Sequence, residues 1–376
     1  MMILVINCGS SSAKYELYDV ARDKSFCKGV VERVGEKSSL CKNHFEAIAA
    51  IKKYLLSGKC SPLKSIDDIK GIGHRVVHGG EKLSKAVLIN KKVLSVIENL
   101  KDLAPLHNPP SLEGIKACTK YFPGIPQAAI FDTAFHQSMP SYAYIYGIPF
   151  GFYKKYGIRR YGFHGTSHRF VSHAAACSLK KPINKLKIVT VHLGNGCSMA
   201  AVMYGKSVDT TMGFTPLEGL LMGTRCGDID PAVIMYLMKK ENLTALEIEN
   251  ILNKKSGILG VSGKSNDMRD ILAQIKKGNK RAELAFQIFV YRIKKYIGAY
   301  AAAMGGLDVV VFTGGIGEHM PRIKQTLSKE LKPIFKKEVK FMTIPTNEEF
   351  LIAQDTYKLI NDLPMRKEQH NAKSKA

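Results

Sequence analysis

The chain has 376 residues, of which 45% are hydrophobic and 23% are charged, and this composition excludes intrinsic disorder as its main state. Its length suits two domains of ~150–200 residues each. Lysine and arginine number 56 against 32 aspartates and glutamates, so the net charge of +24 would attract anionic partners. The eight cysteines form no CxxC pair, which excludes a zinc ribbon and predicts reduced thiols in the cytoplasm.

The first predicted element is a β-hairpin. The apolar run 3–6 leads into small residues over 7–12, and an alternating pattern resumes over 14–20. We expect no signal peptide, because the apolar start is short and has no basic residues before it. The uncharged run 133–153 is broken by prolines, whereas a spanning helix needs ~20 mostly apolar residues, so we expect no membrane contact.

A second hairpin of the same kind is predicted near the middle of the chain. The strand 188–191 runs into a turn over 192–198, and a strand follows over 199–204. Asn7 in the first turn and Asn195 in the second are separated by half the length of the chain. This spacing indicates a duplicated architecture.

Helices and one more strand complete the pattern. A helix is predicted over 230–240, where Pro231 suits the first turn, and another over 282–304, where apolar residues recur at helical spacing. The wholly apolar run 309–312 is typical of a strand buried on both faces of a sheet. The mixture predicts an α/β fold, and the polar tail 365–376 is expected to fray.

Three turns rich in glycine or serine follow predicted strands, at 7–12, 192–198 and 313–317. Backbone N–H groups in such turns can reach phosphate oxygens because no side chain intervenes. None of the turns ends in the Gly-Lys-Ser/Thr of a P-loop, and none has the third glycine of a dinucleotide site. The turns therefore predict a polyphosphate ligand that is held in another way.

Two arginines lie between glycines, Arg75 in GHRVVHGG and Arg225 in GTRCGD. An arginine in such a run is either paired structurally or is a fixed binding group for an anion, and both interpretations stay open. Asp228 and Asp230 are expected to serve as the N-cap and first-turn acids of the helix that begins near Pro231.

One histidine pair and one aspartate complete the candidates. His164 and His168 have the i, i+4 spacing of a metal site, but glycines flank His164 and no HExxH motif exists. We favour an anion-contacting or catalytic histidine, with a buried structural histidine as the alternative. Asp132 ends the apolar run 128–131 and is either a buried carboxylate or a turn aspartate. As a set, these groups are what phosphoryl transfer between anions requires.

From residue 2 to about 359 the chain resembles the acetokinase family of the actin-like, sugar-kinase and heat-shock-chaperone ATPase superfamily. The matching segments are VINCGSSSAKY, GHRVVHGG, LAPLHNPP, FDTAFH, RRYGFHGTSH, HLGNG, MGFTPLEGL, TRCGDIDP, FTGGIGE and IPTNEE. The resemblance implies duplicated ribonuclease H-like (actin-like ATPase) domains with an interdomain active-site cleft. It implies an N-terminal lobe of 1–136 plus 352–376 and a nucleotide-binding and dimerisation lobe of 137–351.

The activity implied by the resemblance is a reversible, Mg²⁺-dependent (or Mn²⁺-dependent) in-line transfer of a phosphoryl group from ATP to acetate, in a homodimer. Arg75 would bind the acetate carboxylate, and Asp132 would orient Arg75. Arg225 and His164 would stabilise the phosphoryl group in transit.

The same resemblance implies the residues that bind each ligand. Those implied for the metal ion are Asn7 and Glu348. Those implied for the methyl group of acetate, together with Arg75 for its carboxylate, are Val77, Leu106, Phe163 and Pro216. Those implied for the nucleotide are Lys14, His192, Leu193, Gly194, Asn195, Gly196, Asp267, Met268, Arg269, Gly314, Gly315, Ile316 and Gly317.

Three alternatives remain. A kinase for propionate or another short-chain acid of the same family would differ in the methyl pocket, where Val77 favours acetate. An ATP-binding interaction protein of the superfamily would have no catalytic use for Arg75 and Arg225. A nucleic-acid binder would use the net charge, but lysines occur in scattered pairs such as Lys52-Lys53, so we expect no such partner. Because Cys197 and Cys226 adjoin the site motifs, we also expect their alkylation to inhibit.

Overall fold

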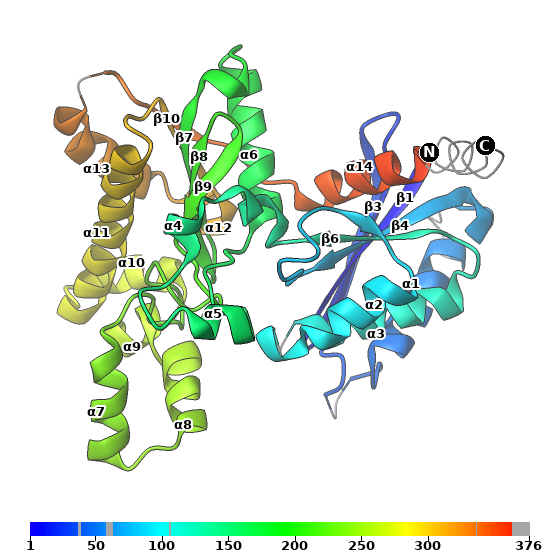
Figure 1. Ribbon diagram of the computed structural model, residues 1–376, viewed down its shortest axis with the longest axis horizontal. Helices are drawn as coiled ribbons and strands as arrows, with labels where there is room; N and C mark the ends of the chain where they lie inside the picture. The colour runs from blue at the N-terminus through cyan, green and yellow to red at the C-terminus, as the bar shows by residue number, and fades with distance from the viewer. Residues whose placement is uncertain (37–38, 58–62, 105–106, 336, 363–376) are drawn as a thin grey trace. The chain divides into compact units, whose positions relative to one another are not determined.

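The computed structural model describes residues 1–36, 39–57, 63–104, 107–335 and 337–362, so that Cys60, Leu106 and the tail 365–376 lie outside the described residues. The chain divides into two compact units, one formed by Met1–Ala134 with the segment from Asn347 onward and the other by Phe135–Thr346. Figure 1 shows that each unit contains a β-sheet with helices packed on it. The expected lobe boundaries at 136/137 and 351/352 remain predictions.

The first unit contains a six-stranded sheet in the order β3-β2-β1-β4-β6-β5. Its strands are β1 (Met2–Gly9), β2 (Ser12–Asp19), β3 (Lys24–Glu32), β4 (Ile69–Val76), β5 (Val87–Leu88) and β6 (Gln127–Phe131). Strands β1 and β2 form the first predicted hairpin. Its turn is shorter than expected, because Gly9 pairs with Ser12 and Asn7 still lies within strand β1.

Helices cover both faces of this sheet. They are α1 (His44–Ser57), α2 (Lys91–Asn99), α3 (Asn108–Tyr121) and α14 (Glu348–Asn361), with short 3₁₀ turns η1 (Ile66–Asp68) and η2 (Lys101–Leu103). Leu4 and Ile6 of β1 belong to the apolar core of α1 and α3, whereas Ile3 and Val5 pack with Ile352 of α14. Both faces of β1 are therefore buried, which explains why its apolar run is continuous rather than alternating.

The second unit repeats the same topology. Its sheet has the order β11-β10-β7-β8-β9, and its strands are β7 (Lys187–Leu193), β8 (Cys197–Met203), β9 (Lys206–Thr210), β10 (Val309–Thr313) and β11 (Lys340–Thr343). Strands β7, β8 and β9 form an antiparallel meander like that of β1, β2 and β3. β10 and β11 then add in parallel, as β4 and β6 do. The duplicated actin-like fold is confirmed.

The helices of the second unit include both predicted ones. They are α4 (Ser141–Tyr144), α5 (Gly151–Tyr156), α6 (Gly165–Ser178), α7 (Pro231–Glu241), α8 (Ala245–Asn250), α9 (Gly257–Ser262), α10 (Met268–Lys276), α11 (Lys280–Ala303), α12 (Gly314–His319) and α13 (Pro321–Leu331). The short 3₁₀ helices are η3 (Ala134–Ser138), which begins at the boundary with the first unit, η4 (Ile183–Lys185) and η6 (Lys332–Ile334), and η5 (Ile251–Lys255) is a π-helix. Asp230 caps α7, as expected. Among the described residues, we find no helix with the length and apolarity that crossing a membrane requires.

Candidate active site

A buried ion pair lies at the carboxyl end of the first sheet. Arg75 is near the end of β4 and Asp132 follows β6, and because these strands are parallel neighbours, both side chains reach the same edge. The Arg75 Nε donates to Asp132 Oδ1 at 3.0 Å, and its Nη2 donates to Oδ2 at 2.6 Å. The Asp132 side chain is 1% exposed. Asp132 is therefore a buried carboxylate, and it lies in the turn that follows β6.

This pairing leaves part of the Arg75 guanidinium for another partner. Within the described residues, its Nη1 makes no hydrogen bond. Burial alone would lower the pKa of Arg75, but the carboxylates of Asp132 and Glu348 outweigh it and raise the pKa above its usual value. The arginine is thus always charged and is oriented by Asp132. The structural pairing is confirmed, whereas binding of an anion at the remaining donor edge stays a prediction.

Glu348, the first residue of α14, joins this cluster with its Oε2 at 3.7 Å from Arg75 Nε. Burial raises the pKa of Glu348 to about 7, although the positive charge of Arg75 opposes this, and the charge of Asp132 adds to it. Lys14 of β2 is near enough to lower this pKa, and Asn7 of β1 lies opposite Lys14 in the hairpin. The residues predicted for the metal and for phosphate contact therefore share one region of the first unit.

The oxygen atoms of Asn7 and Glu348 suit a hard divalent cation. The described residues contain no group of three or more histidine, cysteine, aspartate or glutamate side chains that could hold a metal by themselves. Mg²⁺ commonly uses one or two carboxylates and takes its other ligands from water and substrate phosphates. The donor set therefore fits a metal ion that arrives with a phosphate ligand.

In the second unit, three predicted residues meet around Gly196. A Cβ placed on Gly196 would lie 3.5 Å from Arg225 Nη2 and 3.5 Å from His164 Cε1. Arg225 Nη1 donates to the carbonyl oxygen of Pro216 at 2.8 Å, which brings a predicted pocket residue to the same place. Burial lowers the pKa of Arg225. A guanidinium and an imidazole thus face a turn without side chains, as anion contact requires.

His164 is held in an unusual conformation. It precedes α6 with φ of 55°, a left-handed value that is uncommon for a residue other than glycine and frequent at functional sites. Its Nδ1 lies 2.9 Å from Ser198 Oγ, and its ring stacks on His192 at a centroid distance of 4.4 Å. Phe163 before it is buried. Sequence reasoning missed Ser198, which lies within the predicted turn 192–198 but was given no role.

His168 is the structural histidine that the sequence left as an alternative. It lies in the first turn of α6, whereas His164 immediately precedes that helix. Its two ring nitrogens lie 2.7 Å from Thr190 Oγ1 and 2.7 Å from Ser198 Oγ, and it is fully buried. The i, i+4 pair is therefore not a metal site.

Two predicted nucleotide segments lie side by side. The turn 194–196 joins β7 and β8, and its Gly194 N–H donates to Gly196 O. Asn195 Oδ1 accepts from Asn266 Nδ2 at 3.1 Å, which links this turn to Asp267, the N-cap of α10. Met268 is buried, and Arg269 is exposed and paired with Asp267. Asn266 was missed, although it adjoins a predicted segment.

The predicted turn 313–317 is a helix instead. α12 begins at Gly314, whose φ is 77° and whose N–H donates to Glu318 Oε1 at 2.9 Å. A Cβ on Gly314 would come within 2.7 Å of the Leu193 carbonyl oxygen, so α12 starts directly against the end of β7. The expectation of a turn was wrong because the glycines permit close packing here rather than chain reversal.

Asp228 is a second correction. It was expected to serve the start of α7, but its Oδ1 accepts from Gly219 N at 2.9 Å and its Oδ2 accepts from Tyr296 OH at 2.7 Å. It also pairs with Arg292 of α11. Asp228 therefore fixes the loop that carries Arg225, and its partners lie too far along the sequence for a local pattern to predict.

The model of the acetokinase family matches residues 2–337. The chain belongs to the acetokinase family. It is 53% identical over 400 aligned positions to an acetate kinase of Thermoanaerobacter pseudethanolicus, an alignment that covers 96% of this chain and 100% of that protein.

Solved structures of acetokinases superpose closely on the chain. The acetate kinase of Porphyromonas gingivalis has a TM-score of 0.90 at 43% identity and covers 96% of this chain and 99% of that one. A propionate kinase of Francisella tularensis has a TM-score of 0.89 at 42% identity and covers 95% and 99%. Backbone similarity alone therefore does not separate the two acids.

The thiols beside the acetokinase motifs are poor targets. Cys197 is fully buried, and burial raises its pKa to about 12. Burial also raises the pKa of the half-buried Cys226. Because the thiolate is the reactive form, these shifts argue against the expected inhibition by alkylation, most strongly for Cys197.

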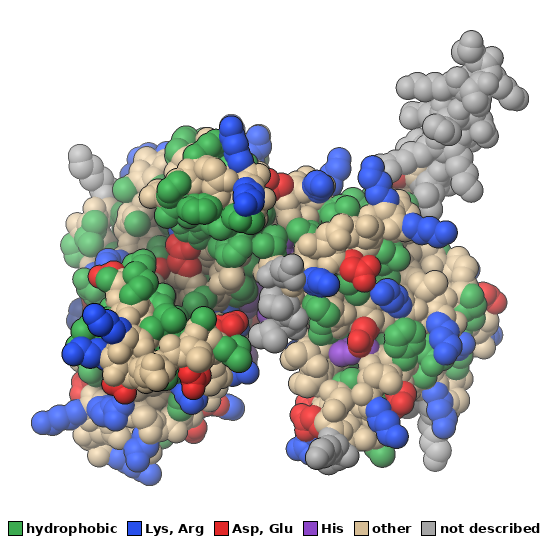
Figure 2. Space-filling model, turned by 60° about the horizontal axis from the view of Figure 1, so that its bottom comes forward, with side chains coloured by type: hydrophobic (Ala, Val, Ile, Leu, Met, Phe, Trp, Pro, Cys, Tyr) green, Lys and Arg blue, Asp and Glu red, His purple; other side chains and the backbone are tan. Residues whose placement is uncertain are grey.

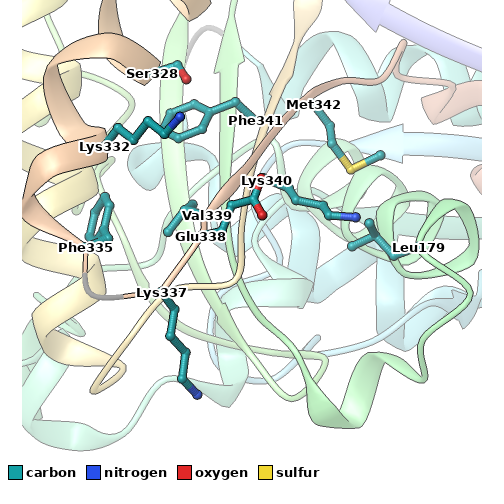
Figure 3. A pocket seen from close by; sticks show the side chains of 10 residues that line it. All are labelled: Leu179, Ser328, Lys332, Phe335, Lys337, Glu338, Val339, Lys340, Phe341 and Met342. Carbon is teal, nitrogen blue, oxygen red and sulfur yellow. The ribbon is translucent and has the colours of Figure 1, made fainter.

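A pocket of about 660 Å³ in the second unit lies apart from the acetokinase motifs. Figure 3 shows its lining, in which lysine and phenylalanine side chains from the segment between α13 and β11 surround the opening. It contains none of the predicted site residues. This opening is therefore separate from the two clusters of predicted site residues described above.

Proposed function

We propose that this member of the acetokinase family transfers the terminal phosphoryl group of ATP to acetate, reversibly and with a divalent metal ion, giving acetyl phosphate and ADP. The observation that carries this proposal is the identity of 53% to an acetate kinase over 96% of the chain. The two clusters of anion-binding side chains support it. An ATP-dependent interaction protein would not require either cluster.

Arg75 binds the carboxylate of the acid through the guanidinium edge that Asp132 leaves open. Asp132 holds the guanidinium by two hydrogen bonds, which fixes the direction of that edge. A bidentate arginine pair gives both orientation and charge. Val77 follows Arg75 by two residues, and with Leu106, Phe163 and Pro216 it would surround the methyl group.

The acid oxygen attacks the terminal phosphorus as the bond to the bridging oxygen of ADP breaks. The acid arrives as a carboxylate, so no proton has to be removed. Arg225 and His164, which meet at Gly196, donate to the phosphoryl oxygens as their charge is redistributed. Asp132 is thus an orienting group, with proton transfer in the reverse direction as a secondary role.

The nucleotide is held by Lys14 and by the segments 192–196, 267–269 and 314–317. We propose that Asn7 and Glu348 hold the metal ion, Mg²⁺ or alternatively Mn²⁺. When bound, such an ion neutralises charge on the β- and γ-phosphates. We further propose that the protein works in the cytoplasm as a homodimer, which light scattering of the purified chain would test.

A kinase for propionate is the second candidate, because the backbone matches a propionate kinase, with a TM-score of 0.89, as well as it matches an acetate kinase. Two carbons offer little area for binding, and one methylene is worth only ~1–3 kcal/mol in selectivity. On the face shown in Figure 2, lysine and arginine side chains are scattered among other residues, which does not favour a nucleic-acid partner.

The test is the formation of acetyl phosphate, trapped as the hydroxamate, from ATP and Mg²⁺ with acetate, propionate or butyrate. We expect the highest kcat/KM with acetate, and no product above background from Asp132→Ala. A higher value with propionate would favour the second candidate. No product with any of the acids would reject the proposal.

A further inference from the structure

A chain of hydrogen bonds runs from the interior of the second unit to His164. Thr190 Oγ1 on β7 lies 2.7 Å from His168 Nδ1 on α6. His168 Nε2 lies 2.7 Å from Ser198 Oγ on β8, and Ser198 Oγ lies 2.9 Å from His164 Nδ1. Thr190, His168 and Ser198 are fully buried, so water does not compete for these bonds.

The protons in this chain allow two arrangements. Burial, with smaller contributions from His136 and His192, lowers the pKa of His168 well below its usual value, so His168 carries one ring proton. Within the described residues, the hydrogen-bond partners of Ser198 Oγ are these two imidazoles. If it accepted from both, its own buried proton would have no acceptor, so it donates to one and accepts from the other. The direction in which the protons point is therefore the same along the whole chain.

In the first arrangement the protons point toward the site. Thr190 donates to His168 Nδ1, His168 Nε2–H donates to Ser198, and Ser198 donates to His164 Nδ1. A neutral His164 then carries its proton on Nε2, where it is a donor. In the reversed arrangement His164 Nδ1 carries the proton, and a neutral ring offers only an acceptor at Nε2.

The distances favour the first arrangement. The reversed one requires Thr190 to donate elsewhere, and its available acceptor is the Ala200 carbonyl oxygen at 3.4 Å, which is long for a hydroxyl donor. The first arrangement uses only the contacts of 2.7 to 2.9 Å.

We propose that Thr190, His168 and Ser198 are positioning residues that hold His164 as a neutral imidazole with its proton on Nε2. His164 then donates to the phosphoryl group without having to be charged. This extends the function proposed above, on which its catalytic meaning rests.

The surroundings of His164 agree with a neutral ring. The titratable and charged groups near it include His192 of β7, stacked at 4.4 Å, and Arg225, which meets it at Gly196. A neighbouring positive charge opposes protonation of an imidazole, as does a hydroxyl that already donates to Nδ1. The proposal predicts that His164 stays neutral at pH values where an exposed histidine is half protonated, near ~6.5.

The first test uses the unaltered protein. In a long-range ¹H–¹⁵N spectrum of ¹⁵N-histidine-labelled protein at pH 7.5, the spin system that disappears in His164→Gln should be neutral and protonated on Nε2. A neutral ring protonated on Nδ1, or an imidazolium, would overturn the proposal. Because this spectrum needs no turnover, its result does not depend on whether acetate is phosphorylated.

The second test breaks the chain at Ser198. Ser198→Ala should raise the pKa of His164 toward its ordinary value and lower kcat about ten-fold, the scale of one hydrogen bond, with KM for acetate unchanged. Ser198→Thr, which keeps the hydroxyl, should restore both kcat and the shape of the pH profile. An unchanged His164 titration and pH profile in a folded Ser198→Ala protein would overturn the proposal.

Discussion

The two units share the order of five strands, to which β5 adds a sixth in the first unit, yet the corresponding strand ends carry different chemistry. In the first unit, the parallel strands β4 and β6 end with Arg75 and Asp132, a buried pair of fixed charges. In the second unit, β10 ends at Thr313, and Gly314 begins α12 directly after it. The first edge suits a carboxylate, whereas the second offers backbone groups and small residues that suit phosphates.

The hairpins differ in the same sense. The first turn contains two residues between Gly9 and Ser12, while the second contains the three residues 194–196. Gly196 in this longer turn is where Arg225 and His164 meet. The fold thus provides equivalent edges, and local residues decide what each edge binds.

The largest expected effect concerns the ion pair of the first unit. Asp132→Asn should destabilise that unit by ~3 kcal/mol, because it leaves the Arg75 charge without its main partner. Glu330→Gln in the second unit breaks an exposed pair with Lys294 and should cost less than ~1 kcal/mol. Urea unfolding followed by hydrogen exchange in peptides of each unit measures both. Equal losses of unfolding free energy in the two variants would show that the Asp132–Arg75 pair stabilises its unit no more than an exposed ion pair does.

Acid should affect the second unit more than the first. Burial lowers the pKa of His136 to about 4 and that of His168 well below its usual value. Below pH ~6.5 the unfolded state therefore binds more protons than the folded state, and the free energy of unfolding decreases as the pH decreases. In the first unit, burial lowers the pKa of His74 to about 4, but burial raises that of Glu348 to about 7, and a raised carboxyl pKa favours the folded state as pH falls.

From pH 7 to 5, His136 alone should cost the second unit roughly 2 kcal/mol and His168 should add to this loss, while the two groups of the first unit offset each other. The same unit-resolved urea experiment at both pH values checks this. The matched control is His319→Gln at an exposed position, which should leave the pH dependence of the unfolding free energy unchanged in both units. A steeper loss in the first unit would contradict the assignment.

The proposed chemistry of the second unit rests on Arg225. Arg225→Ala should lower kcat for acetyl phosphate formation at least ~10²-fold with the fold intact, as when one donor to a transition state is removed. Arg22→Ala, at a position whose side chain is 77% exposed, should leave kcat unchanged. Activity of Arg225→Ala within a few-fold of the unaltered protein would reject its role.

Adjacent glycines at the start of α12 provide a smaller, matched comparison. Gly314→Ala should destabilise the second unit by ~1–3 kcal/mol, because φ is 77° and the new Cβ would lie 2.7 Å from the Leu193 carbonyl oxygen. Gly315→Ala has no atom within 4 Å of its new Cβ and should be close to neutral. Thermal unfolding of the two variants measures the difference. Equal midpoints would show that the close contact at position 314 does not constrain packing.

The smallest expected effect is on selectivity. Val77→Ala should enlarge the methyl pocket and raise the preference for propionate relative to acetate by up to ~10-fold. The ratio of the two kcat/KM values measures it. An unchanged ratio would remove Val77 from the pocket.

Much of the fold could be predicted because these elements follow from patterns of neighbouring residues. The apolar runs 3–6 and 309–312 are buried strands, and Pro231 begins a helix as expected. The half-chain repeat predicted the duplication because both hairpins kept similar turn residues.

Other features depend on partners that are distant in sequence. Ser198 links two histidines, and Asp228 binds α11, so neither role follows from neighbouring residues. The turn expected at 313–317 was wrong for the same reason, since Gly314 is required by contact with Leu193. Residue types indicated the chemistry correctly, whereas tertiary contacts decided which groups are structural.

We propose above all that Arg75 binds the acid while Arg225 binds the phosphoryl group that passes to it. A crystal structure with ADP, Mg²⁺, acetate and aluminium fluoride tests it most directly, because the planar fluoride occupies the place of the group in transit. We predict an acetate oxygen in line with the fluoride, with the guanidinium of Arg75 on the acetate and that of Arg225 on the fluoride. Guanidinium groups that lie far from these ligands would contradict the account.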